Sequence, residues 1–186
     1  NQSKGVFAEF SSSEELNIQE LAHPFIPINS QVKNDLEFNT HEKFYIVTGP
    51  NMAGKSTYLR SVGWALISAN AGFPVMAKKC VIPVMCLYTS MRTADDLNEQ
   101  SSFFHAELKR LRFIVDAIER GEKVFVILDE ILKGTNSKDK EEGSAGLLRK
   151  LAKLNARGII ATHDLSLCKL AEESTEFRNR YFDSTI

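Results

Sequence analysis

The stretch GPNMAGKS, residues 49–56, constrains the fold of this chain more than any other feature. It matches the pattern G-x-x-x-x-G-K-[ST], and it lies between the apolar run FYIV and a segment with helical spacing of apolar residues up to Asn70. A glycine-rich turn in this context directs backbone N–H groups inward, and the helix N-terminus adds partial positive charge. A chance match of four fixed positions would arise in about one chain of this length in a hundred. The turn is therefore predicted to bind phosphate.

Two side chains at the end of this turn suit a nucleotide. Lys55 is expected to reach the β- and γ-phosphates, and Ser56 to place its hydroxyl on Mg²⁺. Further along the chain, Asp129 and Glu130 follow the apolar run VFVIL, and His163 follows IIAT. Ligands of open α/β sheets bind at the carboxyl edge of the strands, where these three side chains are expected to lie.

Each of these three residues has a chemical interpretation and a plainer one. Asp129 can hold Mg²⁺ through water, Glu130 can accept a proton from an attacking water, and His163 is directed toward the γ-phosphate. The alternatives are acids that merely end a strand at the surface and a histidine with a packing role. Because a phosphate-binding turn is also present, the catalytic interpretation of the two acids is favoured. For His163, the position at the end of a strand favours the catalytic interpretation.

Strands and helices are predicted to alternate along the chain. Six segments are typical of strands: LNIQELAHPFI, VKNDLEF, KFYIVTG, CVIPVMCLYTS, KVFVILDE and GIIAT. Pro83 in the fourth of these places it at a sheet edge or a bulge. Helices are predicted over residues 55–70, 101–120 and about 143–154. This alternation indicates an α/β fold with right-handed crossovers.

Composition narrows the class of protein. The 186 residues are 43% apolar, which suits one domain with one sizeable core, and a net charge of −1 gives no chain-wide attraction for nucleic acid. No apolar run has the length of a membrane span. Three cysteines, Cys80, Cys86 and Cys168, form no C-x-x-C pair, so buried, inert thiols in a reducing compartment are expected rather than disulfides or a zinc site. A cytoplasmic protein without membrane partners is therefore predicted.

Two serines, Ser101 and Ser102, open the second predicted helix, residues 101–120. From physics alone, Ser102 is a candidate for its N-terminal cap, and Glu107 is interpreted as solvated helix surface. His105 has no assigned role.

Six segments, taken in order, resemble the ATPase domain of the MutS family of DNA mismatch repair proteins: LAHPFI, VKND, TGPNMAGKSTYLRSVG, TADDLNEQSSFFHAEL, VILDEILKGTNSKD and IIATHD. The resemblance runs from about Glu20 to Glu172. The Asn-Met pair inside the phosphate turn and the Gly-Thr pair that follows Asp-Glu distinguish this family from other phosphate-binding turns.

The resemblance implies a P-loop NTPase of the ABC-ATPase-like kind, with a mixed sheet flanked by helices, that uses ATP and Mg²⁺. The Walker A motif then consists of Gly49, Pro50, Asn51, Met52, Ala53, Gly54, Lys55, Ser56 and Thr57. Asn51 becomes a catalytic partner of the γ-phosphate or of the attacking water. Ser56 and Asp129 become the metal-binding residues. Glu130 becomes the catalytic base and His163 the γ-phosphate sensor.

A second part of the site is implied to act in trans. Ser102 resembles the signature serine before the family's Phe-x-x-Glu, here Phe104 and Glu107, and would contact ATP bound by the other protomer. This displaces the interpretation of Ser102 as a cap alone. The segment after Glu130 resembles the D-loop that crosses to the partner, with Thr135, Asn136, Ser137 and Asp139.

Two positions depart from the family's pattern. Gln100 stands where members often have glycine, two residues before the signature serine, which predicts weaker or differently shaped signature contacts. Gln31 stands where members often have an aromatic residue that stacks on adenine, which weakens the expectation of adenine selectivity.

The expected organisation is a loose N-terminal segment, residues 1–13, followed by a MutS-type ATPase domain, residues 14–186. Because the chain begins without methionine and ends at YFDSTI, it is expected to be part of a longer protein. The resemblance implies a homodimer with composite ATP sites, DNA contacts through domains outside this chain, and a MutL-type protein as a further candidate partner.

The expected function is Mg²⁺-dependent ATP hydrolysis that controls a DNA-bound dimeric clamp in mismatch repair. The alternatives are a MutS-like protein with a recombination or other DNA role and a nucleotide-gated binding module without turnover. An ABC transporter or SMC-like ATPase would carry an LSGGQ-type signature, which the sequence lacks.

Overall fold

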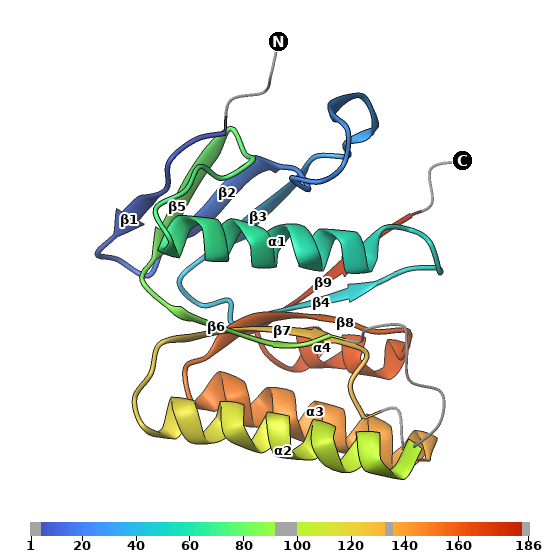
Figure 1. Cartoon of the computed structure of the whole chain (residues 1–186). Coiled ribbons are helices and arrows are strands. Elements are labelled where there is room, and N and C mark those ends of the chain that lie inside the picture. The colour runs from blue at the N-terminus through green and yellow to red at the C-terminus, as the bar shows by residue number, and fades with distance from the viewer. Residues whose placement is uncertain (1–4, 92–99, 133–135, 184–186) are drawn as a thin grey trace.

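The strands form two sheets in the computed structural model, which describes residues 5–91, 100–132 and 136–183 (Figure 1). The first sheet has the order β1 (Glu9–Ser11), β5 (Lys79–Pro83), β2 (Leu16–Leu21), β3 (Asn34–Phe38). The second has the order β6 (Cys86–Ser90), β7 (Val124–Asp129), β8 (Arg157–Ala161), β4 (Phe44–Thr48), β9 (Phe177–Tyr181). The four-stranded sheet is mixed, whereas every pair in the five-stranded sheet is parallel.

The helices lie in separate layers. They are α1 (Lys55–Asn70), α2 (Gln100–Glu119), α3 (Ser137–Lys153) and the short α4 (Leu170–Glu173), with 3₁₀ turns η1 (Ile28–Ser30) and η2 (Leu165–Lys169). Figure 1 shows α1 between the two sheets and α2, α3 and α4 on the opposite side of the five-stranded sheet. Among the described residues, no helix has the length and apolar character that crossing a bilayer requires.

The central strands of the parallel sheet contribute side chains to two hydrophobic cores. In β4, Tyr45 and Val47 join the core beneath α1, and Phe44 and Ile46 join the core with α2 and α3. All five residues of β4 are buried. A strand covered on both faces favours apolar residues at consecutive positions, which explains the runs FYIV in β4, VFVIL in β7 and GIIA in β8. Arg157, the buried first residue of β8, pairs with Glu14 at 3.2 Å.

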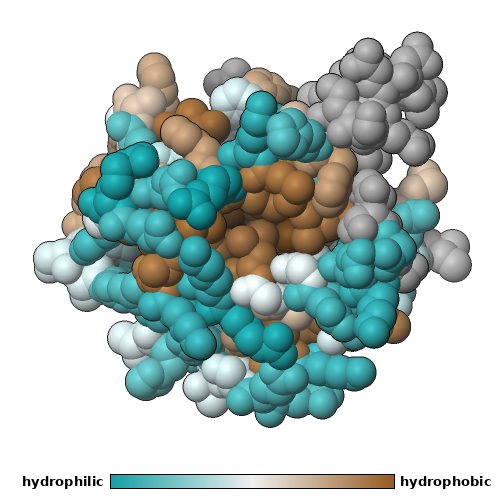
Figure 2. Space-filling model, turned by 90° about the horizontal axis from the view of Figure 1, so that it is seen from below, coloured by the Kyte–Doolittle hydropathy of each residue, from teal (hydrophilic) through white to brown (hydrophobic). Residues whose placement is uncertain are grey.

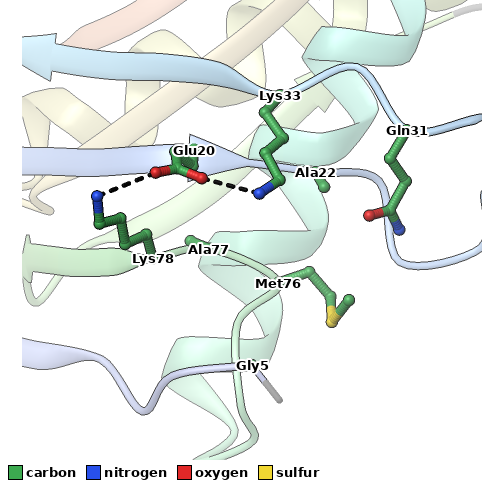
Figure 3. A pocket seen from close by; sticks show the side chains of 8 residues that line it. All are labelled: Gly5, Glu20, Ala22, Gln31, Lys33, Met76, Ala77 and Lys78. Atoms are coloured by element: carbon green, nitrogen blue, oxygen red, sulfur yellow. Dashed lines mark hydrogen bonds and ion pairs between the residues drawn. The ribbon is translucent and has the colours of Figure 1, made fainter. Parts of the chain in front are cut away.

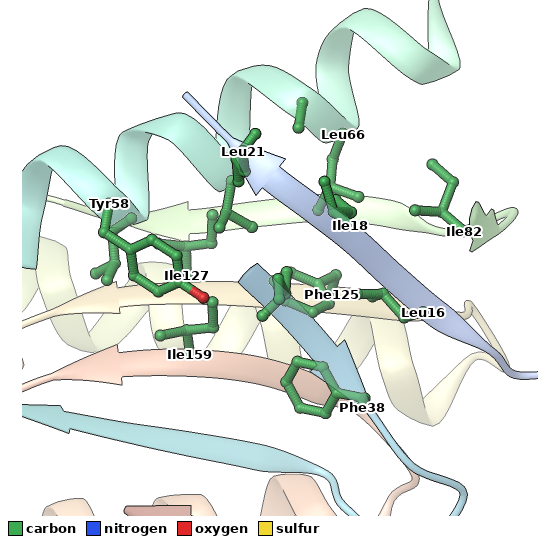
Figure 4. Packing of buried hydrophobic residues seen from close by; sticks show 14 of the residues in the cluster. Leu16, Ile18, Leu21, Phe38, Tyr58, Leu66, Ile82, Phe125, Ile127 and Ile159 are labelled. Carbon is green, nitrogen blue, oxygen red and sulfur yellow. The ribbon is translucent and has the colours of Figure 1, made fainter. Parts of the chain in front are cut away.

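In the four-stranded sheet, β2 and β3 are covered on one face, whereas β5 is buried from Cys80 to Pro83. Leu16 and Ile18 in β2 and Leu36 and Phe38 in β3 are buried, and the residues between them are half-buried or exposed. These side chains meet α1 and the upper face of the parallel sheet, as Figure 4 shows for Leu16, Ile18 and Phe38 near Phe125. Because the side-chain period of a strand is two residues, this alternation is the expected pattern for a sheet with one solvated face.

The face formed by α2 and α3 is not uniformly polar. Seen from below in Figure 2, hydrophobic side chains gather at its centre and hydrophilic ones surround them. On α2, Leu108 and Phe113 remain exposed.

The predicted alternation of strands and helices is confirmed, and α1 spans the predicted residues 55–70. Gly72 and Gly121, which follow the ends of α1 and α2, have positive φ angles of 75° and 90°. An α/β fold flanked by helices is therefore present. The expected single mixed sheet is instead two sheets, of which only the four-stranded one is mixed.

Two local predictions are wrong. Residues 1–13 were expected to be loose, but Glu9–Ser11 forms β1, which pairs with β5, and Val6 bridges Val75. The segment CVIPVMCLYTS was expected to be one strand at an edge or a bulge. It is divided between β5, inside the four-stranded sheet, and β6, at the edge of the parallel sheet, and Pro83 is the last residue of β5. Proline lacks an N–H, so it suits the place where the chain leaves one sheet for the other.

The cysteines agree with the prediction only in part. Cys80 is buried, and burial raises the pKa of its thiol to about 11, as expected for an inert thiol. Cys168 is half-buried, and burial also raises its pKa. Cys86 is exposed, so the prediction of a buried thiol is wrong there, because β6 lies at the sheet edge.

Candidate active site

The glycine-rich turn connects β4 to α1 and depends on close backbone contact. Gly49 has a φ of 141°, and a Cβ atom there would lie 2.1 Å from the carbonyl oxygen of Phe182. That approach is held by a hydrogen bond from the Phe182 N–H to the carbonyl of Thr48, at 2.8 Å. No residue with a side chain fits at position 49 without displacement of the segment after β9.

The other end of the turn leaves helix N–H groups available. Gly54, with a φ of 89°, immediately precedes α1, and no side chain caps the helix. The first N–H groups of a helix have no partner within the helix and carry partial positive charge, so they attract an anion. Asn51 and Met52 are exposed on the same turn, and Met52 also has a positive φ, 66°.

Lys55 is held inside this turn. Its Nζ donates to the carbonyl oxygens of Gly49, at 2.7 Å, and of Pro50, at 2.8 Å, and the residue is only 7% exposed. Burial lowers the pKa of the ammonium, and the negative charge of Asp129 opposes that shift. A buried cation among carbonyl oxygens and close to a carboxylate is well placed for an anionic ligand, since phosphate would add charge compensation.

The parallel register brings the predicted site residues to one edge. Strand β8 lies between β4 and β7, with Ala161 opposite both Val47 and Asp129. The ladder continues beyond the strand ends, because Thr162 N–H donates to Val47 (3.0 Å) and Glu130 N–H donates to Ala161 (2.9 Å). The turn after β4, His163 after β8 and the acids that end β7 are therefore neighbours, as the sequence predicts.

Glu130 and His163 are in direct contact. The Nε2 atom of His163 lies 2.7 Å from Oε1 of Glu130, and the two side chains are 41% and 17% exposed. Glu130 has a φ of 52°, a left-handed conformation that costs a non-glycine residue about 1–3 kcal/mol and is found most often at functional sites. The strained turn places a half-buried carboxylate beside an imidazole that solvent and ligands can reach.

The residues predicted to hold Mg²⁺ have suitable chemistry. Ser56 lies in the first turn of α1, and Asp129 ends β7; both are half-buried. The described part of the chain contains no cluster of three or more histidine, cysteine or acidic side chains that could bind a metal by itself. Mg²⁺ in nucleotide sites is usually held by one or two protein oxygens together with phosphates and water. A hydroxyl and a carboxylate therefore fit a metal that arrives with the nucleotide.

The start of α2 differs from the prediction made from physics alone. The described part of the helix runs from Gln100, so Ser102 lies within the helix rather than at its cap. The side chains of Gln100 and Ser102, and all of Thr135, lie outside the described residues. Asn136 in the D-loop-like segment caps α3, since its side chain accepts the N–H of Asp139 at 2.9 Å.

Glu107 is not merely solvated helix surface, so that interpretation is wrong. Its Oε1 accepts a hydrogen bond from the backbone N–H of Leu132, at 3.1 Å, two residues after Glu130. The sequence gives no local signal for this contact, because 25 residues separate the two groups.

Gln31 occupies the position at which the family resemblance implies an aromatic residue that stacks on adenine. Its Nε2 donates to the carbonyl oxygens of Ile26 (2.9 Å) and His23 (3.2 Å), so the side chain is bound to its own loop. It lines a cavity of about 230 Å³ in which Glu20 pairs with Lys33 and Lys78, as Figure 3 shows. A side-chain amide in this position lacks the aromatic face on which a base would stack.

A phosphate-type turn between a parallel strand and a helix, with acids at the end of another strand of the same parallel sheet, defines a P-loop nucleotide-binding domain. The family model that describes MutS domain V matches residues 45–185, and the chain belongs to this family. MutS domain V is an ATPase domain of the P-loop class.

Relatives from several bacteria agree with this assignment. The chain is 32% identical over 183 residues to the DNA mismatch repair protein MutS of Thermotoga sp. (strain RQ2), covering 97% of this chain and 22% of the relative. It is 33% identical over 173 residues to the DNA mismatch repair protein MutS of Persephonella marina, and the match covers 91% of this chain and 20% of the relative. It is 31% identical over 183 residues to the DNA mismatch repair protein MutS of Lactobacillus delbrueckii subsp. bulgaricus, and the match covers 95% of this chain and 21% of the relative. The chain thus spans about a fifth of the length of the curated relatives it matches.

Proposed function

We propose that this chain hydrolyses ATP with Mg²⁺ as the ABC-like motor domain of a MutS-family mismatch repair protein. The observation that carries the proposal is the common edge of β4, β8 and β7, where Lys55 lies near Asp129 and Glu130 touches His163. The family match supports the nucleotide, and the printed names of the relatives support the repair role. A cytoplasmic location is proposed on the same basis.

The glycine-rich turn and the start of α1 bind the phosphates of ATP. Backbone N–H groups between Asn51 and Thr57 surround the phosphates, and Lys55 exchanges its carbonyl partners for β- and γ-phosphate oxygens. Ser56 and Asp129 would hold Mg²⁺, which would neutralise charge on the phosphates. Asn51, exposed on the turn, is proposed to contact the γ-phosphate or the water.

The chemical step falls to the residues after β7 and β8. Glu130 accepts a proton from the attacking water, whose oxygen bonds to the γ-phosphorus while the bond to the β-phosphate oxygen breaks, giving ADP and phosphate. His163, within 2.7 Å of that carboxylate, orients it and senses the γ-phosphate. The strained backbone at Glu130 supports this role, because it holds the carboxylate in one position.

The experiment for ATP use compares two lysines in the full-length protein. Lys55→Ala should weaken ATP binding by about 100-fold, roughly 2.7 kcal/mol, because a charge-assisted contact to phosphate is lost. Lys79→Ala, an exposed lysine of β5, is the matched control and should bind normally. Titration calorimetry and Mg²⁺-dependent phosphate release measure both. Wild-type protein that binds ATP without releasing phosphate would instead be a nucleotide-gated binding module.

We also propose that Ser102 acts on the nucleotide of the partner in a homodimer that grips DNA through domains outside this chain, with a MutL-type protein as a candidate partner. In a two-fold dimer, each site combines one protomer's turn with the other's signature helix. Ser102→Ala and Glu130→Gln protomers should each be nearly inactive as homodimers. Mixed in equal amounts, they should regain about a quarter of the sites. No gain on mixing, with heterodimers demonstrated, contradicts action in trans.

A further inference from the structure

One hydrogen bond connects helix α2 to the turn that carries Glu130. The carboxylate of Glu107, on the second turn of α2, accepts the backbone N–H of Leu132 at 3.1 Å. Leu132 lies two residues after Glu130 along the chain. The contact therefore crosses between two elements that the sequence separates by a long interval and that no strand pairing joins at this point.

The turn needs such a contact because it is strained. Both Glu130 and Leu132 have left-handed backbone conformations, with φ angles of 52° and 58°. Each costs a residue with a side chain about 1–3 kcal/mol and persists only where the surroundings hold it. Ile131 and Leu132 are buried in the core with α2 and α3, so a Leu132 N–H without an acceptor would be costly.

We propose that Glu107 is a positioning residue for ATP hydrolysis: its hydrogen bond to Leu132 holds the turn in which the Glu130 carboxylate meets His163. Among the described residues, Glu107 forms no hydrogen bond with the glycine-rich turn or with Lys55. It therefore acts on the chemical step through Glu130 and leaves ATP binding unaffected. This inference rests on the proposed function, because it takes Glu130 to be the base.

The chemistry of the contact predicts which substitutions are tolerated. Glutamine keeps the length of the side chain and a carbonyl oxygen that accepts the same N–H, so Glu107→Gln should preserve the turn. Aspartate keeps the charge but is one methylene shorter, and a hydrogen bond at 3.1 Å does not survive such a retreat without movement of the helix. Alanine removes the acceptor altogether. A role that depends only on charge would give the opposite order for glutamine and aspartate.

The test uses the full-length protein and measures ATP affinity and single-turnover hydrolysis separately. Glu107→Ala and Glu107→Asp should slow hydrolysis by about tenfold or more, with ATP dissociation constants within about twofold of wild type. Glu107→Gln should remain within about threefold of the wild-type rate. The matched control is Glu119→Ala, which removes a carboxylate of the same helix that pairs with Lys150 at 3.0 Å, and its rate should be unchanged.

The outcomes separate this inference from the proposed function. Unchanged hydrolysis in the alanine and aspartate variants overturns the positioning role, and so does a loss shared equally by the glutamine variant. If the alanine variant does not fold, the comparison of aspartate with glutamine decides alone. If Glu130→Gln hydrolyses ATP as fast as wild type, the proposed function fails. If all three Glu107 variants hydrolyse ATP at the wild-type rate while Glu130→Gln is inactive, only the role of Glu107 is overturned.

Discussion

The two sheets differ in how their strands are covered, and the difference separates chemistry from support. Strands β4, β7 and β8 of the parallel sheet are buried on both faces, and every candidate catalytic side chain lies in or just beyond their carboxyl ends. In the four-stranded sheet, β2 and β3 bury only part of their residues: Leu16, Ile18 and Leu21 in β2, and Leu36 and Phe38 in β3. A strand held from both sides cannot shift without disturbing two cores, so it suits a site that needs fixed positions. The four-stranded sheet mainly closes the core above α1.

Truncation of consecutive residues tests this comparison most strongly. Phe125→Ala and Val126→Ala in β7 should both lower the free energy of unfolding, by about 4 and about 2 kcal/mol, because the two side chains enter opposite cores. In β3, Leu36→Ala should cost about 3 kcal/mol and its neighbour Glu37→Ala less than about 0.5. Urea denaturation provides all four values. A neutral Val126→Ala would show that the lower face of the parallel sheet is not packed.

The second prediction concerns the glycine-rich turn, at the carboxyl ends of the strands of the parallel sheet. Gly49→Ala should destabilise the protein by about 3 kcal/mol and abolish ATP binding, because the new methyl group meets the Phe182 carbonyl at a strained φ. Gly146→Ala in α3 is the control: nothing lies near its position, and alanine in a helix should raise stability by about 0.5–1 kcal/mol. Thermal unfolding and ATP titration measure both. Normal ATP binding by Gly49→Ala would contradict the close approach of the two segments.

The smallest expected effect lies where α1 meets the four-stranded sheet. The hydroxyl of Tyr58 in α1 donates to the carbonyl of Asp35 in β3 at 3.1 Å, and burial raises the pKa of this phenol. Tyr58→Phe should cost about 1 kcal/mol, because Arg180 still donates to the same carbonyl. Tyr181→Phe, at an exposed position of β9, should change nothing measurable. A loss of several kcal/mol in Tyr58→Phe would mean that α1 and the four-stranded sheet depend on this one bond.

The central strands were predictable because each is an uninterrupted apolar run, and α1 because its apolar residues recur at helical spacing. The exposed edge strands, β9 and β1, could not be predicted from the sequence. Strand β9 reads FRNRY, and its pairing with β4 compensates for side chains that alone favour a loop. Strand β1 lies in a serine-rich segment and depends on pairing with β5. Such strands are stabilised by distant partners, which local sequence does not reveal.

The candidate site divides in the same way. The glycine-rich turn and the acids after β7 follow from a motif and a strand end, so Lys55, Asp129 and Glu130 could be placed at one edge from the sequence. The fixed contacts around them could not. The hydrogen bonds of Lys55 to its own turn and of Glu107 to Leu132 depend on backbone conformation, including positive φ angles at residues with side chains. No residue type signals those angles in advance.

The central claim is that the carboxyl edge of the parallel sheet hydrolyses ATP with Glu130 as the base. The most direct test is single-turnover hydrolysis by Glu130→Gln, with ATP affinity measured by titration calorimetry on the same full-length protein and Glu119→Gln as control. We expect the dissociation constant to stay within about threefold of wild type and hydrolysis to fall by about 100-fold or more, since general-base catalysis is lost while the phosphate contacts remain. Hydrolysis at the wild-type rate, or an equal loss of ATP binding, would contradict the account.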